Sequence, residues 1–182
     1  LAKLYHKGGN SAKAAKVLEE SIKITNDFTN PPTKYETLST ISKCAFEIGL
    51  VEIGEKLVNE ILNNIRSLNV LKRINIISYL GVAVSKHDVG RGDSLVFHAA
   101  QLVEKCDETP HKIKGLIKVA RRLVEVSNDI ENIRTARNWL SQALRLAENL
   151  TLEDELKLLT EIIGDVYLVS ENKANEIMHY LI

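Results

Sequence analysis

The chain has 182 residues, of which 45% are hydrophobic and 26% charged, a balance typical of a folded globular protein. Lys and Arg together number 24, as do Asp and Glu, so the formal net charge is zero. This neutrality argues against broad nucleic-acid binding, which usually needs a basic excess, and no apolar run reaches the ~18 residues of a membrane span.

The first part of the chain predicts two helical hairpins separated by a proline break. We expect helices at residues 1–6, 11–25, 33–48 and 51–68. Ser11 is the expected N-cap of the second helix, and Gly8-Gly9-Asn10 and Gly49 mark the turns within the hairpins. Asn30-Pro31-Pro32 separates the hairpins because proline cannot continue a helix.

The rest of the chain continues this alternation. We expect helices at residues 70–86, 94–105, 110–127, 131–149 and 152–169, and a final truncated helix from Asn172 onward. The helix at 70–86 is apolar around most of its circumference, which suits a central position with neighbours on both flanks. The glycine-containing segment from His87 to Asp93 predicts a long connection, with Ser94 as the cap of the next helix. Thr151 is expected to cap the helix that follows it.

A small residue recurs at intervals of 40, 45, 37 and 38 residues, each time in the second helix of a hairpin. These repeat markers are Ala14, Gly54, Ala99, Ala136 and Ala174. Bulkier, mostly apolar residues follow at offsets of four and seven, on the same helix face, so a neighbouring helix can pack closely there. Five such helices in series predict an all-α fold, a right-handed α-α superhelix (solenoid) of about five helical hairpins. Residues 1–182 would form a single array, which we expect to be a piece of a longer chain.

Two of the glycine turns carry a family resemblance. Gly9 and Gly49 are each followed five residues later by a small residue, and the segment from Phe46 to Ile61 is similar to the turn and second helix of the tetratricopeptide repeat (TPR). The intervals exceed the usual TPR period of about 34 residues, and the aromatic and Leu-Gly signature of the first helix is mostly missing. The chain therefore resembles a divergent TPR-like array, with HEAT or armadillo repeats as rival structures. The resemblance implies a protein-interaction scaffold whose first helices line a concave groove.

Basic residues on two expected first helices form the candidate partner-binding site. They are Lys114, Lys118, Arg121 and Arg122 on the helix at 110–127, extended by Lys72 and Arg73 on the helix at 70–86. Spacings of four, seven and eight residues place the first four along one side of a helix. Such a cluster could hold an acidic or phosphorylated peptide, or a chain-terminal carboxylate. The alternative is a solvated helix face that Glu125 and neighbouring acids partly neutralise. Tyr35 and Tyr79 are the candidate groove aromatics.

Other chemistry finds little support in the sequence. The five histidines are scattered without metal-ligand spacing, and no nucleophile and base lie at catalytic spacing, so we expect no metal, no cofactor and no enzyme activity. Cys44 and Cys106 are expected to be buried free thiols, which favours the cytoplasm. The predicted function is a protein–protein interaction scaffold or adaptor that binds a peptide or helix in its groove. The alternatives are an architectural or regulatory segment of a larger protein, and an RNA-binding helical repeat, which would need a continuous basic track.

Overall fold

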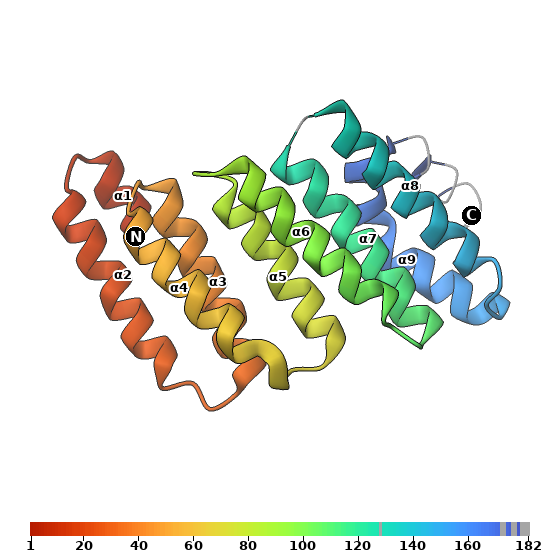
Figure 1. Cartoon of the computed structure of the whole chain (residues 1–182), viewed down its shortest axis with the longest axis horizontal. Coiled ribbons are helices and arrows are strands. Elements are labelled where there is room, and N and C mark those ends of the chain that lie inside the picture. The colour runs from red at the N-terminus through yellow and green to blue at the C-terminus, as the bar shows by residue number, and fades with distance from the viewer. Residues whose placement is uncertain (128, 172–173, 176–177, 179–182) are drawn as a thin grey trace.

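The computed structural model describes residues 1–127, 129–171, 174–175 and 178 (Figure 1). All regular secondary structure in this described part is helical, which confirms the expected all-α class. The α-helices are α1 (Ala2–Lys7), α2 (Ser11–Asn26), α3 (Pro31–Glu47), α4 (Val51–Asn64), α5 (Val70–Val84), α6 (Val89–Glu104), α7 (Thr109–Val126), α8 (Ile130–Ala147) and α9 (Leu152–Val169). A short 3₁₀ turn at Ile65–Ser67 follows α4. None of the described helices combines the length and apolar composition that crossing a bilayer would require.

Most helix starts lie where the sequence places them, and side chains cap several of them. The Asn30 side chain accepts a hydrogen bond from the Thr33 amide at 3.1 Å, and Thr151 accepts one from the Asp154 amide at 3.3 Å. Such bonds satisfy amides that have no partner within the first helical turn. The predicted cap at Thr151 is confirmed.

The predicted caps at Ser11 and Ser94 are wrong. Asn10 caps α2 through the Lys13 amide, at 3.0 Å, so Ser11 is already the first helical residue. Asp88 caps α6 through the Arg91 amide, also at 3.0 Å, and α6 therefore begins five residues earlier than Ser94. The two glycines that suggested a long loop thus lie inside the first turn of α6.

The helices pack as consecutive hairpins whose alternate members lie side by side (Figure 1). Within the hairpins, α3 packs on α4, α5 on α6, and α7 on α8. Between hairpins, α3 contacts α5, α5 contacts α7, and α7 contacts α9. We call the surface built from α3, α5, α7 and α9 the odd-helix face. It is the surface on which the predicted first-helix residues lie.

The repeat markers are buried in the structure. Ala14, Ala99, Ala136 and Ala174 are each 0% exposed. A Cβ atom on Gly54 would lie 2.8 Å from the Phe46 ring, so no larger residue fits there without rearrangement. The apolar residues four positions later are buried as well, except Met178, which is 44% exposed. Leu181, seven positions after the last marker, lies outside the described residues, as do most residues of the helix expected from Asn172 onward.

The central helix α5 is enclosed on most sides, as its composition predicts. It packs against α3, α6 and α7, and weakly against α4. Its buried apolar residues are Ile74, Ile76, Ile77, Leu80, Val82, Ala83 and Val84. Burying so many large side chains stabilises the fold by about 1.5–3 kcal/mol for each one, before the entropic cost of ordering the chain. The partly accessible side chains of α5 include Lys72, Asn75 and Tyr79.

Candidate functional site

The predicted basic residues of α7 are partly buried rather than freely solvated. Lys118 lies within electrostatic range of Arg121 and Arg122 on its own helix and of Lys72 on α5. The structure therefore brings these four cations together on the odd-helix face. Arg73 takes no part in the ion pairs of the described residues, and its Nε atom is buried without a hydrogen-bond partner.

Carboxylates from the neighbouring helix α9 neutralise two of the α7 cations. Lys114 forms an ion pair with Glu161, and Arg121 forms one with Asp165. These partners lie 47 and 44 residues away in sequence, so only the packing of α7 against α9 brings them together. The expected cluster of free positive charge is smaller than the sequence indicates.

Two further carboxylates pair with Arg122 and Lys72. Glu125 bridges two arginines: its carboxylate oxygens accept hydrogen bonds from Arg121 Nε and Arg122 Nη1, each at 2.7 Å. Burial raises the pKa of Glu125, but the bonds from Arg121 and the charge of Arg122 outweigh this effect and hold that pKa below its usual value. On the other side of the face, Lys72 Nζ lies 2.8 Å from Glu36 Oε1 on α3.

Lys118 differs from the other three predicted cations of α7 because it forms no ion pair with any described residue. Burial lowers the pKa of this half-buried ammonium group; Asp165 opposes the effect, and the nearby Arg122, Arg121 and Lys72 reinforce it. Three cationic neighbours and a single acidic one leave this lysine in a locally positive environment, which an added negative charge would stabilise. Among the six predicted binding residues, Lys118 is the one best placed to meet an anionic ligand.

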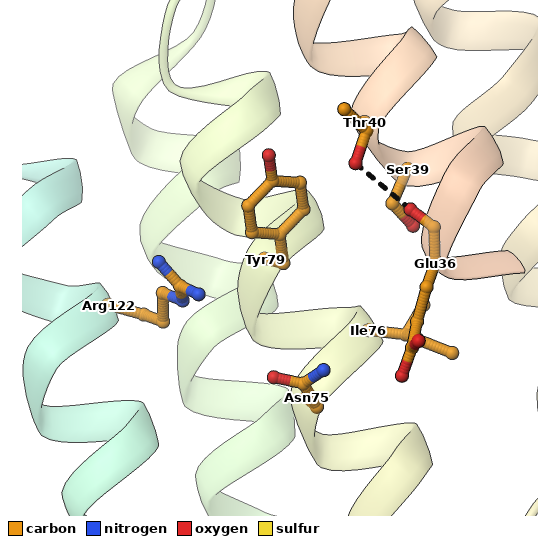
Figure 2. A pocket seen from close by; sticks show the side chains of 7 residues that line it. All are labelled: Glu36, Ser39, Thr40, Asn75, Ile76, Tyr79 and Arg122. Carbon is orange, nitrogen blue, oxygen red and sulfur yellow. Dashed lines mark hydrogen bonds between the residues drawn. The ribbon is translucent and has the colours of Figure 1, made fainter. Parts of the chain in front are cut away.

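A pocket of about 270 Å³ opens on the odd-helix face between α3, α5 and α7 (Figure 2). Its lining residues are Glu36, Ser39 and Thr40 from α3, Asn75, Ile76 and Tyr79 from α5, and Arg122 from α7. Figure 2 shows Arg122 extending from α7 toward Tyr79, with the polar residues of α3 on the opposite side. The pocket combines an aromatic ring, an aliphatic side chain, hydroxyl groups, an amide and a guanidinium group. This mixture is typical of a surface that orients a ligand through a few polar contacts.

The Tyr79 ring forms cation–π contacts with one residue from α7 and one from α3. The Arg122 guanidinium carbon lies 5.1 Å from the centre of the Tyr79 ring, and Lys43 Nζ from α3 lies 5.4 Å from it. Cations within about 6 Å of an aromatic ring face are attracted by its quadrupole. Tyr79 thus contacts two positive groups, of which Arg122 also lines the pocket; its role as a groove aromatic stays a prediction.

The sequence analysis missed the contribution of α3. Glu36, Ser39, Thr40 and Lys43 follow the i, i+3, i+4, i+7 spacing of one helix face, which could have indicated a polar strip beside the basic residues. The strip carries opposite charges and two hydroxyl groups, so it lacks the single-sign pattern that made α7 conspicuous. Tyr35, the other candidate aromatic, packs partly buried against the core.

Neither metal nor thiol chemistry adds to this site. Within the described ranges, no group of three or more His, Cys, Asp or Glu side chains could hold a metal ion. Cys44 is partly buried on α3, and Cys106 is buried after α6; both are free thiols whose pKa burial raises. Comparison of the chain with models of protein families, with curated proteins and with solved structures gives no match. The geometry of the odd-helix face is therefore the main indication of its function.

Proposed function

We propose that this chain is a protein–protein interaction scaffold that binds a peptide or a helix along the odd-helix face. The observation that carries the proposal is the pocket between α3, α5 and α7, which three successive hairpins line with an aromatic ring, an aliphatic side chain and several hydrogen-bonding groups. A peptide laid across these helices would contact several of them at once. Buried aromatic and arginine side chains at the centre of such a surface commonly supply most of the binding energy.

We further propose that the hairpins form a TPR-like, right-handed α-α superhelix in which the odd-helix face is concave. The packing of α3, α5, α7 and α9 in series supports this arrangement. The two free thiols are compatible with the cytoplasm, which we propose as the location. We propose no catalytic role.

The ion pairs favour a protein partner over RNA. Lys72, Lys114, Arg121 and Arg122 each have a carboxylate partner, which weakens the attraction that a phosphate backbone would need. An RNA-binding array would instead present its cations unpaired along a continuous track, with bases stacking on aromatic rings. An architectural role, in which another segment of a longer chain covers the pocket, remains the alternative that the experiment below separates.

The experiment compares two tryptophan substitutions in exposed helical residues. Thr40 borders the pocket, whereas Ser94 lies on α6; each hydroxyl donates to the carbonyl four residues earlier, at 3.1 and 2.9 Å. Thr40→Trp should fill the mouth of the pocket, and Ser94→Trp is the matched control. Both variants and the unmodified chain would be used as bait in nuclease-treated extract, with circular dichroism as the check of folding.

We expect a protein that the unmodified chain and Ser94→Trp both retain, and that Thr40→Trp retains at least tenfold less. Equal retention by all three baits would contradict binding at the pocket. If none of them retains a protein, the architectural interpretation replaces the proposal.

A further inference from the structure

Positive charge at the pocket exceeds what the described carboxylates neutralise. Glu36 lines the pocket, but Lys72 already pairs with it. Arg122 pairs with Glu125 and also approaches the Tyr79 ring. Lys43 contacts the same ring, so it adds a positive charge that has no ion pair within the described chain.

Lys118 adds a second unpaired cation on the same side of α7. Two of its charged neighbours are tied to the pocket, since Arg122 lines it and Lys72 is bonded to Glu36 in its wall. Partial burial removes water from the Lys118 ammonium group, and its acidic neighbour Asp165 is already paired with Arg121. An incoming anion would therefore gain more from this lysine than from a fully hydrated one.

The polar groups that line the pocket differ in whether they already form hydrogen bonds. The hydroxyl groups of Ser39 and Thr40 donate to backbone carbonyls of α3, at 2.7 and 3.1 Å. The Asn75 amide and the Tyr79 hydroxyl make no hydrogen bond within the described residues, and both side chains line the pocket (Figure 2). Each has an N–H or O–H group that could donate to an oxyanion.

We propose that the pocket is an anion subsite that binds a carboxylate or phosphate side chain of an acidic peptide. Asn75 and Tyr79 donate hydrogen bonds to the anionic oxygens, and Arg122, Lys43 and Lys118 supply the opposing charge. The subsite rests on the proposed scaffold function and adds the chemistry of its partner. Charge-assisted hydrogen bonds of this kind are roughly twice as strong as neutral ones.

The test uses three fluorescein-labelled octapeptides in which glycine alternates with glutamate, phosphoserine or lysine. Fluorescence anisotropy measures the dissociation constant of each one with the intact chain, and the NMR signal of the Asn75 side-chain amide reports where it binds. We expect both acidic peptides to bind and to shift the Asn75 signal, and the lysine peptide to do neither. Tighter binding of the phosphoserine peptide would identify phosphate as the preferred group, and tighter binding of the glutamate peptide would identify carboxylate.

A matched pair of double variants separates the subsite from general charge attraction. Lys43→Gln with Lys118→Gln removes the two unpaired cations, and Lys23→Gln with Lys56→Gln removes two exposed lysines of α2 and α4. We expect at least a tenfold loss of affinity for the acidic peptides in the first variant and less than twofold in the second. Equal losses, or acidic peptides that bind no better than the lysine peptide, would overturn the subsite. Loss of partner capture by Thr40→Trp would still uphold the scaffold function in that case.

Discussion

Gly81 on α5 and Gly92 on α6 lie so close together that a Cβ atom on either one would be 2.8 Å from the carbonyl oxygen of the other. The Cβ of Gly92 would also meet Ser85, at 2.8 Å from its Cβ atom. Rigid backbone atoms form part of this contact, so a side chain at position 92 could be accommodated only if the two helices moved apart. The close approach holds the central hairpin together, and it explains why glycine stands within a helix at a cost in helical propensity.

Gly92→Ala should destabilise the protein by about 1–3 kcal/mol, the usual cost of overpacking a close helix contact. Urea denaturation followed by circular dichroism would measure the change. The control is Gly164→Ala in α9, where a Cβ atom would meet nothing within 4 Å. That change should leave the stability equal or raise it by up to about 1 kcal/mol, because alanine favours the helix. Equal stability of Gly92→Ala and the unmodified protein would contradict the close contact.

Stability should fall at acidic pH partly through Glu125. Its pKa in the folded protein lies below the ordinary value of 4.5, so the deprotonated form contributes stability above that pH. The contribution is lost as the pH falls through the folded-state pKa. Glu125→Gln should therefore lower the unfolding free energy at pH 7 and reduce its loss on acidification, as measured by urea denaturation across this range. The exposed Glu20→Gln is the control, and an equal effect of both changes would argue against the arginine bridge.

Lys118 should reduce the stability of the folded protein at neutral pH. Its pKa is below the ordinary value of 10.5, so the unfolded chain binds the proton more tightly, and the cost diminishes as the pH rises toward that value. Lys118→Met should raise the unfolding free energy by roughly 0.5–2 kcal/mol while weakening the binding of acidic peptides. Lys23→Met, an exposed control on α2, should do neither. A destabilised Lys118→Met variant would show that the ammonium group has a structural partner.

The two thiols should react at different rates. Burial raises the pKa of both, which reduces the reactive thiolate at neutral pH, but Cys44 is partly accessible whereas Cys106 is 8% exposed. Titration with Ellman's reagent at pH 7 should modify Cys44 first and Cys106 only as the chain opens. Cys44→Ser should remove the faster phase. A fast phase that persists in this variant would contradict the burial of Cys106.

The sequence predicts most of the helices because local residue patterns mark where each helix begins and ends. Prolines, glycine turns and capping residues mark their ends, and the small repeat markers identify the faces that pack. The predicted start of α6 is wrong, and the reason lies in its packing against α5. Gly90 and Gly92 carry the composition of a loop, but Gly92 is glycine because α5 passes close by, a tertiary cause that no local pattern shows.

The candidate site is less predictable for the same reason. The row of cations on α7 is visible in the sequence, but their partners Glu161 and Asp165 lie on α9, more than 40 residues away. Among the four predicted cations of α7, only Lys118 forms no ion pair with a described residue, and Lys43, which the sequence analysis did not select, contacts the Tyr79 ring from α3. Which charges are free is decided by how the helices pack.

The pocket has walls that belong to three separate hairpins, because α5 packs against both α3 and α7. A molecule bound in this pocket would contact α3, α5 and α7 at once and would therefore restrain the spacing of these helices. A change in the spacing of these three helices would change the shape of the pocket, since each of them contributes part of its lining.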